Sequence, residues 1–557
     1  MTFRSRLAVL TAVVLLPLSL AIAGPAEALT GVSGLKVITT GSKAPTTASL
    51  WFSWTWSSKP TKYVLQVSSD KTFKKDLRTK TVLRASKKPS GGVQTVQVAS
   101  LTNATKYYAR IKGTTSTSSS AWSSAKTGST KARYPAAVTS FTTTPGPLPG
   151  EATISWKTSG DFTTGFRFVT SLTSYTKGQT GRMQKTTSFS ASTRSKTFSA
   201  SELTALGAPL ASANFLWGRF YSDNKGTGGS ATTELLGWKP VVAKGQAASG
   251  TGAPLVVANY NVRTFSATPN TGDYAWSNRV GKVVTNILTA DPDILTLQEV
   301  SPAPLVTGLP ATQSSSLLDE LQSRQPGARH YVYGRSTPFT STGSTPAGGT
   351  QAQRIVYDAN KFTQVAGDTC NDAPKQASCA FDPGGDSRWA TYLHLQSVAD
   401  PTVTFWVVAA HPDPGRSTDT ASETKRATEI NGITAMMSTL AAAGEPVILG
   451  MDSNSWQTYP YSEPLSKTAL LAAGYYDTSA SANVANRLDN YKYSTDNTKW
   501  YGSTGVQKQT DGYAPRLDVI AVKNMPGSDD FEIDAHPTDP YPGSDHNLVR
   551  AEIKLPH

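Results

Sequence analysis

Six short polar motifs in the second half of the chain each stand beside an apolar run that has the length of a strand. They are Asn259-Tyr260-Asn261, Gln298-Glu299, His411, Asp452-Ser453-Asn454, Asp518 within Arg516–Ile520, and Ser544-Asp545-His546. A single histidine after a strand is more often a structural residue, and an isolated Asp-x-Asn is usually a turn. The ordered series of six is what indicates a site, because strand ends bring side chains to a common edge of a sheet.

The residue types in this series suit hydrolysis of a phosphate ester. Two imidazoles can act as base and acid across a phosphoryl group. Carboxylate and amide oxygens are the ligands of a hard cation such as Mg²⁺ or Ca²⁺, and the series contains no sulfur ligand. We therefore expect a metal ion, Mg²⁺ first, with Ca²⁺ or Mn²⁺ as alternatives.

The apolar runs and the segments between them predict one mixed α/β domain at 254–557. The runs read as buried strands; they are Leu255–Ala258, Ile294–Leu297, Phe405–Ala410 and Val447–Leu449. Between them, apolar residues recur at helical spacing, on one face from Trp276 to Ile287 and on another from Ala427 to Leu440. Strands that alternate with helices over such a length are typical of a single α/β domain.

The first half of the chain predicts two small β-sandwiches. Tyr63, Leu65 and Val67 alternate with polar residues, as do Tyr107, Ala109 and Ile111. The pattern Leu101-x-x-x-Thr105-x-Tyr107, followed by Trp122, resembles a fibronectin type III module, and that resemblance makes Tyr107 the corner tyrosine. We expect residues 29–133 to form this module and residues 134–244 to form a second, more divergent one. Residues 245–253 have the composition of a flexible linker.

The first 28 residues have the pattern of a signal peptide, so we expect a secreted, extracellular protein. Arg4 and Arg6 precede an apolar stretch, and small residues follow it. No later segment is apolar for long enough to cross a membrane. The two cysteines, Cys370 and Cys379, are close in sequence and predict a local disulfide. Zinc is the competing interpretation, but no further ligands stand nearby at a familiar spacing.

The net charge of +14 hides an uneven distribution. From 29 to 250 there are 29 Lys and Arg against 7 Asp and Glu, and from 251 onward 22 against 31. The basic surplus of the first half suits nucleic acid, an anionic cell-surface polymer or acidic lipid, while a merely well-solvated surface is the alternative.

The six motifs resemble, in order, those of the endonuclease/exonuclease/phosphatase superfamily, and within it the deoxyribonuclease I family. Asn259–Phe265 is similar to the first strand of that nuclease family, and Leu297-Gln298-Glu299-Val300 to its metal-ligand motif. The resemblance implies two packed mixed β-sheets flanked by helices. It also places the cysteine pair in a small disulfide loop, followed by a phosphate-contacting arginine at Arg388.

By that resemblance, Glu299 binds the metal with support from Asn261 and Asp545. Asp452 and Asn454 bind metal or the scissile phosphate and place the attacking water, and Asn261 also faces the phosphate. His411 and His546 form the acid–base pair, and Asp518 orients His546. Three positions depart from the family: Gln353 replaces a glutamate that supports the first histidine, Ser301 replaces an arginine, and Gln351 stands where a minor-groove tyrosine is expected.

These observations predict a secreted, metal-dependent phosphodiesterase, first of all an endonuclease on extracellular DNA or RNA, acting as a monomer. A phosphatase or phosphodiesterase on lipid, sugar or inositol phosphates is the alternative, because the metal and phosphate apparatus is retained while the known DNA contacts are not. A catalytically inactive adhesion protein is a third interpretation, which the retained motifs disfavour. We also expect the α/β domain to fold without residues 29–250.

Overall fold

The computed structural model describes residues 28–158, 163–172, 185–214, 216–226, 229–234, 238–325, 327, 329–334, 353–366, 380–381, 383–384, 389–415, 419–455, 464–497, 500, 516–534 and 542–556. Contacts divide the chain into two compact units. The first is Met1–Pro135 with Asp161–Thr164 and Asp223–Thr233; the second is Ala136–Gly160, Gly165–Ser222 and Glu234–His557. The chain is mostly β, with several sheets and few helices.

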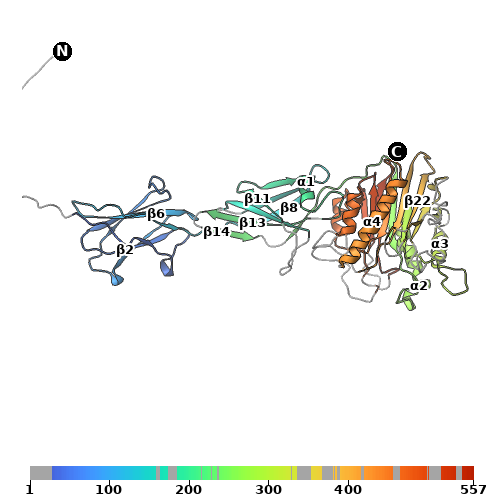
Figure 1. Cartoon of the computed structure of the whole chain (residues 1–557), viewed down its shortest axis with the longest axis horizontal. Coiled ribbons are helices and arrows are strands. Elements are labelled where there is room, and N and C mark those ends of the chain that lie inside the picture. Colours follow the sequence, from blue (N-terminus) through green and yellow to red (C-terminus); the bar gives the residue numbers. More distant parts are fainter. Residues whose placement is uncertain are drawn as a thin grey trace, which may run out of the picture. The chain divides into compact units, whose positions relative to one another are not determined.

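The first unit contains a sandwich of a three-stranded and a four-stranded antiparallel sheet (Figure 1). The smaller sheet is β1 (Lys36–Val37), β2 (Leu50–Thr55) and β5 (Val93–Val98); the larger is β4 (Arg78–Leu83), β3 (Lys62–Ser68), β6 (Lys106–Thr114) and β7 (Lys126–Ser129). Short 3-10 turns lie at Gly41–Lys43 and Ser90–Gly92. The predicted alternation is confirmed, since Tyr63, Leu65, Val67, Tyr107, Ala109 and Ile111 all lie in one core. The Tyr107 hydroxyl accepts a hydrogen bond from the Thr102 amide at 2.8 Å, as a tyrosine corner requires.

A second pair of sheets follows. One is β12 (Ser195–Phe198), β9 (Ala152–Thr158) and β8 (Val138–Pro145); the other is β11 (Lys185–Ser190), β10 (Gly165–Ser171), β13 (Leu216–Gly226), β14 (Gly229–Glu234) and β15 (Lys239–Val241). Helix α1 (Ala200–Ala205) begins with a capping box between Ser199 and Glu202. Trp156 and Phe220 pack in the core with ring centroids 4.6 Å apart.

The rest of the second unit is built on two larger mixed sheets. The six-stranded sheet is β18 (Tyr331–Tyr333), β19 (Arg354–Asp358), β17 (Ile294–Gln298), β16 (Pro254–Asn261), β28 (Leu548–Lys554) and β27 (Asp530–Asp534). The seven-stranded sheet is β20 (Phe362–Gln364), β22 (Ala390–Ser397), β23 (Thr404–Ala410), β24 (Val447–Asp452), β26 (Asp518–Lys523) and β25 (Tyr476–Asp477), with β21 (Ala380–Phe381) beside β22. Their facing apolar side chains form one core; Val257, Phe405, Ile448 and Val549 are fully buried there.

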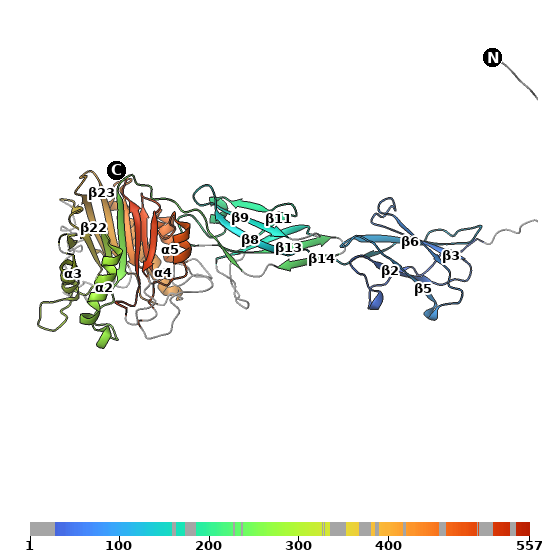
Figure 2. The same ribbon diagram turned by 180° about the vertical axis from the view of Figure 1, so that it is seen from behind.

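Helices cover the outer faces of both sheets (Figure 2). Helices α2 (Trp276–Ala290) and α3 (Gln313–Arg324) pack on the six-stranded sheet, and α4 (Thr420–Leu440) and α5 (Leu465–Ala472) pack on the seven-stranded sheet. A 3-10 turn at Gly272–Tyr274 precedes α2, and α6 (Val484–Asn490) precedes β26. Both helical faces predicted from the sequence are confirmed, because Val284 and Ile287 of α2 and Ile430 and Met437 of α4 are buried.

Two parallel strand pairs explain why the polar motifs meet. β16 is parallel to β17, and β23 is parallel to β24; a helix connects the two strands of each pair. The carboxyl ends of parallel strands lie at the same edge of a sheet. Asn261 and Gln298 therefore end neighbouring strands in one sheet, as Ala410 and Asp452 do in the other.

The segment predicted as a flexible linker packs against the α/β sheets. The Gln246 amide donates to the Tyr476 hydroxyl at 3.4 Å, and the Ala248 amide donates to Asp529 at 3.2 Å. A Cβ on Gly245 would lie 1.6 Å from the Ser481 carbonyl oxygen, so only glycine fits at that position. Its glycine content thus serves close packing rather than free rotation.

Candidate active site

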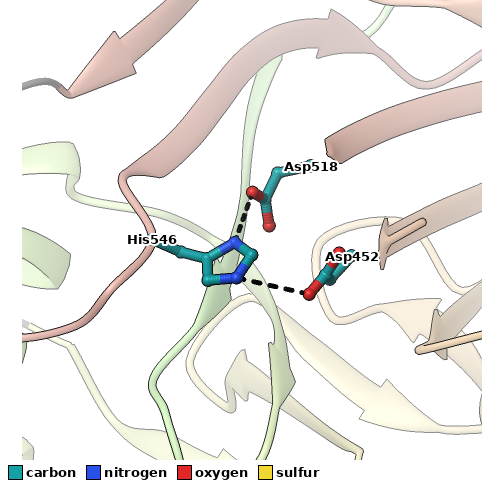
Figure 3. A group of neighbouring side chains, drawn as sticks. All are labelled: Asp452, Asp518 and His546. Carbon is teal, nitrogen blue, oxygen red and sulfur yellow. Dashed lines mark hydrogen bonds and ion pairs between the residues drawn. The ribbon is translucent and has the colours of Figure 1, made fainter. Parts of the chain in front are cut away.

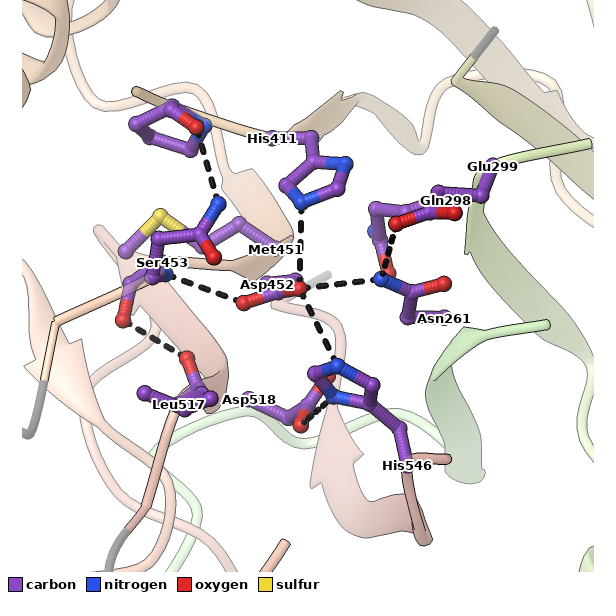
Figure 4. Close-up of polar contacts among 12 residues, drawn as sticks. Asn261, Gln298, Glu299, His411, Met451, Asp452, Ser453, Leu517, Asp518 and His546 are labelled. Carbon is purple, nitrogen blue, oxygen red and sulfur yellow. Dashed lines mark hydrogen bonds and ion pairs between the residues drawn. The ribbon is translucent and has the colours of Figure 1, made fainter. Parts of the chain in front are cut away.

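Asp452, the last residue of β24, lies at the centre of the converging polar motifs (Figure 4). Its Oδ2 atom is 3.1 Å from His411 Nε2 and 3.5 Å from His546 Nε2. The same oxygen accepts a hydrogen bond from Asn261 Nδ2 at 2.9 Å, and Oδ1 accepts one from the Asn454 amide at 2.9 Å. The carboxylate is thus buried and accepts two hydrogen bonds, with an imidazole on either side.

Asp518 supports His546 from the side away from Asp452 (Figure 3). The distance from His546 Nδ1 to Asp518 Oδ2 is 2.8 Å. Asp518 is the first residue of β26, at the end of the strand rather than within it, and it is paired in register with Asp452 of β24. Two carboxylates directly opposite each other would repel, and His546 lies between them, where a positive charge offsets that repulsion.

The electrostatics of the site favour a charged His546. Burial opposes that charge, but Asp518 and Asp452 outweigh it and raise the pKa of His546 well above 6.5. Burial raises the pKa of Asp518 to about 6, although His546 opposes the shift. For Asp452 burial acts in the same direction, yet the interactions with His546 and His411 prevail and hold its pKa far below the ordinary value.

A polar seam between the two sheets holds Asp518 in place. Asn259 Nδ2 donates to Asp518 Oδ1 at 3.3 Å and to the Met451 carbonyl at 3.2 Å. Its Oδ1 accepts from Thr296 Oγ1 and from Gln298 Nε2, both at 2.8 Å. These three seam residues are fully buried. Sequence reasoning gave none of them a role, although Asn259 and Gln298 stand inside the motifs that it singled out.

Glu299 lies beside this seam, in the left-handed region at φ 60°. Its Oε1 accepts from Asn261 Nδ2 at 3.2 Å and its Oε2 from the Thr264 amide at 3.0 Å. The Asn261 amide therefore links the carboxylates of Glu299 and Asp452. Oxygen donors of this kind fit a hard divalent cation, as the sequence predicts, and Glu299, like Asp545, remains partly exposed.

Asp545 is ion-paired with Arg263, whose guanidinium lies 5.0 Å from the centroid of the Trp500 ring. Arg263 was not among the predicted site residues. Asn454, also at positive φ, donates from Nδ2 to the Pro412 carbonyl at 2.9 Å and so joins the loop after β23 to the loop after β24.

Two further residues at the site had no sequence signal. The Thr495 hydroxyl accepts hydrogen bonds from the amides of Leu517 and Asp518, at 2.8 and 3.2 Å. Asp496 pairs with His546 through the backbone, and burial raises the pKa of its carboxyl. Both belong to a segment that is remote in sequence from the other motifs.

Four predicted positions lie outside the described residues: Cys370, Cys379, Arg388 and Gln351. Gln353 and Ser301, the two other departures from the family pattern, are buried. Within the described part of the chain, the structure brings together Asn261, Glu299, His411, Asp452, Asn454, Asp518, Asp545 and His546. No helix among the described residues is long and apolar enough to span a membrane.

Comparison with known proteins gives matches to solved structures alone. No protein-family model matches the chain, and no curated protein matches it significantly. An endonuclease/exonuclease/phosphatase family protein from Bacteroides thetaiotaomicron is 19% identical, with 55% of this chain and 96% of that chain covered and a TM-score of 0.35. The mannosyl-6-phosphatase Bt3783 of Bacteroides thetaiotaomicron VPI-5482 is 19% identical, with coverage of 53% and 98% and a TM-score of 0.33.

For the first part of the chain, a two-domain fibronectin type III segment from chicken tenascin is 15% identical. The match covers 37% of this chain and 98% of the tenascin segment, with a TM-score of 0.24. These neighbours come from the two families that the sequence motifs resemble.

Proposed function

We propose that this protein is a secreted, metal-dependent phosphodiesterase that cleaves nucleic acid. The arrangement that carries the proposal is the chain of contacts from His411 through Asp452 and His546 to Asp518. The Nε2 atoms of His411 and His546 both face Asp452 Oδ2. Asp518 fixes the tautomer of His546. Two imidazoles placed in this way can form an acid–base pair for hydrolysis.

The two histidines take different roles in this proposal. Asp518 accepts the Nδ1 proton of His546, so Nε2 is the atom that faces the reacting group. His546 donates a proton to the leaving oxygen. His411 Nε2, on the opposite side of Asp452, accepts the proton of the attacking water. Asp452 and Asn454 orient that water and the phosphate.

A cation is needed because the site itself is acidic. A phosphate placed about 4 Å from the Asp452 carboxylate would be repelled by roughly 4 kcal/mol at an effective dielectric constant near 20. Glu299, with Asn261 and Asp545, would hold the ion. A divalent cation bound there neutralises charge that develops on the phosphoryl oxygens.

Two sequence features support nucleic acid as the substrate and secretion as the destination. Asn259–Phe265 is similar to the first strand of the deoxyribonuclease I family, and the first half of the chain carries the basic surplus that attracts a polyanion. The pattern of residues 1–28 supports export. The N-terminal sequence of protein recovered from culture medium tests export, and we expect it to begin near Leu29.

The test of activity is nicking of supercoiled plasmid by the purified protein with Mg²⁺, Ca²⁺, Mn²⁺ or chelator. We expect metal-dependent nicking that His546→Ala and His411→Ala lose. His394→Ala is the matched control, because His394 is also largely buried but pairs with Glu445 at 2.6 Å, away from the polar motifs.

The control should retain its rate per folded molecule. Near-normal nicking by His546→Ala would refute the acid–base assignment. No nicking by a folded, metal-binding protein would refute the nucleic-acid substrate, and RNA, phospholipid head groups and sugar phosphates would then be assayed in turn.

A further inference from the structure

Strand β6 of the first unit presents a row of basic and aromatic side chains on its outer face. Tyr107, Ala109 and Ile111 point into the core. Lys106, Tyr108, Arg110 and Lys112 alternate with them on the other face, which is exposed or half-buried. Alternate residues of a strand are roughly 6.6 Å apart, so the row is regularly spaced.

Arg110 is held rigidly in this row by two aromatic rings. Its guanidinium carbon lies 4.2 Å from the centroid of Phe73 and 4.5 Å from that of Trp122. Its Nε donates to Gln66 Oε1, on the neighbouring strand β3, at 2.9 Å. Lys112 Nζ is 4.9 Å from the centroid of Trp122, so this one ring is in contact with two cations.

The chain segment that carries Trp122 is fixed to the same strand. The Ser123 amide donates to the Ile111 carbonyl at 2.8 Å, and the Ile111 amide donates to Ser123 Oγ at 3.1 Å. Trp122 is therefore positioned on the sheet by backbone pairing. The aromatic contact does not depend on a loose loop.

Neither Arg110 nor Lys112 has an acidic partner within the part of the chain that the structure describes. Between 29 and 135 there are 18 Lys and Arg and only two acids, Asp70 and Asp76. Asp70 accepts from the Thr72 hydroxyl and the Lys74 amide, and Asp76 accepts from Ser69 at 2.6 Å. Both acids are engaged within the turn after β3. A rigid arginine without a carboxylate partner is a prepared donor for an anion from outside.

We infer that the outer face of β6, made by Lys106, Tyr108, Arg110, Lys112 and Trp122, binds a single strand of nucleic acid. Phosphates suit the three cations of the row, and bases can stack on the rings of Tyr108 and Trp122. A sulfated polysaccharide would meet the same charges but would gain less from the rings. The inference concerns the first unit alone and does not require the proposed hydrolysis.

The test uses the whole protein in chelator, so that hydrolysis is suppressed, and a fluorescent oligothymidylate of about 16 nucleotides, the upper end of the site size of a small strand-binding domain. Affinity is measured by anisotropy over a series of salt concentrations. We expect Arg110→Ala/Lys112→Ala to weaken binding roughly tenfold and to reduce the slope of log K against log salt by about 1.4, the value for two lost phosphate contacts on a single strand.

Lys87→Ala/Lys88→Ala is the matched control, because it removes the same charge from two exposed residues of the same unit. It should change affinity by less than about twofold. Arg110→Lys keeps the charge but loses the planar group between the rings, and it should bind with intermediate affinity. Thermal unfolding checks that each variant is folded. If Arg110→Ala/Lys112→Ala is not folded, the affinity of Arg110→Lys for the oligonucleotide tests the site instead.

If both double variants weaken oligonucleotide binding equally, only net charge matters, and the proposed binding site on β6 is refuted. Unchanged affinity in Arg110→Ala/Lys112→Ala refutes it as well. A third outcome is that heparin binds with the same dependence on Arg110 while the oligonucleotide does not bind. The ligand of this face would then be a sulfated polymer and not nucleic acid. Hydrolysis of a small chromogenic phosphodiester with metal present should be the same in these variants, so failure of this inference is distinguishable from failure of the proposed function.

Discussion

Replacement of Asp518 by asparagine isolates one charge at the heart of the site. The substitution keeps the shape of the side chain, and an amide oxygen can still accept from Asn259, now 3.3 Å away. The Thr495 hydroxyl contacts both the backbone amide and the side chain of Asp518, and the amide oxygen of asparagine can still accept from it. What is lost is the negative charge 2.8 Å from His546 Nδ1.

The size of the effect follows from that charge. Two unit charges about 4 Å apart at an effective dielectric constant near 20 interact by roughly 4 kcal/mol. The same energy in an activation barrier is about 10³-fold in rate. Without the carboxylate, the protonated form of His546 is less favoured and its ring is no longer fixed with Nδ1 as the donor. We therefore expect the Asp518→Asn variant to lose roughly 10³-fold in kcat and little in KM.

The assay is steady-state hydrolysis of a chromogenic phosphodiester at saturating metal. Asp477→Asn is the matched control, since Asp477 is also buried, and is paired with Arg516 at 3.4 Å rather than with a histidine. That variant should lose stability but keep kcat. A rate for Asp518→Asn within tenfold of the unaltered protein would refute the reasoning, as would an equal loss in the control.

Three further outcomes follow from the described contacts. The Glu445 carboxylate accepts hydrogen bonds from Thr404, Trp406 and the Ala442 amide. Burial opposes the charged form of Glu445, but these hydrogen bonds outweigh burial and lower the pKa of the carboxyl group. The stability that Glu445 contributes is therefore complete above its ordinary pKa of 4.5 and is lost as pH falls through the lowered pKa. Urea unfolding at neutral pH should show a loss of about 2 kcal/mol in Glu445→Gln and a flatter acid limb. Glu299→Gln should weaken Mn²⁺ binding more than tenfold in calorimetry while the protein stays folded. Arg487→Ala should lower the free energy of unfolding by about 3 kcal/mol, because two buried carbonyls lose their donor.

The strands, the main helices and the ordered motifs could be predicted because they are local. Val447–Leu449 is an unbroken apolar run that leads through Gly450 and Met451 to Asp452, and the structure confirms a strand that ends at Asp452. The apolar residues between Trp276 and Ile287 recur at helical spacing, and α2 covers them all. Each of these patterns is complete within a few residues of the chain.

The partners across the site could not be predicted, because they come from packing of distant segments. Nothing in the sequence places Thr495 against the amide of Asp518, or Arg263 against Asp545. Gly450 is a further case: a Cβ there would lie 1.9 Å from Thr296 Oγ1, in the opposite sheet. Such close approach of two sheets is a property of the assembled fold.

The boundary between the second sandwich and the α/β sheets also could not be read from composition. Arg487 donates to the carbonyls of Ser212 and Asn214 at 3.2 and 3.1 Å, and Lys467 donates to Asn214 Oδ1 at 2.9 Å. The Asp477 amide donates to the Ala211 carbonyl at 2.9 Å. The turn at residues 211–214 has the composition of an ordinary surface loop, yet it is buried against the α/β sheets through these hydrogen bonds.

This interface changes how the catalytic part should be delimited. Arg487 and Lys467 are almost wholly buried, and their partners Ser212 and Asn214 belong to the second sandwich. A truncation at residue 250 would expose both, together with Tyr491, because it removes Trp217, whose ring centroid lies 5.9 Å from that of Tyr491. The expectation that the α/β domain folds without residues 29–250 therefore does not suit these contacts. A cut near Pro135 leaves each of these partners in place, because Gly165–Ser222 and Glu234–His557 belong to the same compact unit.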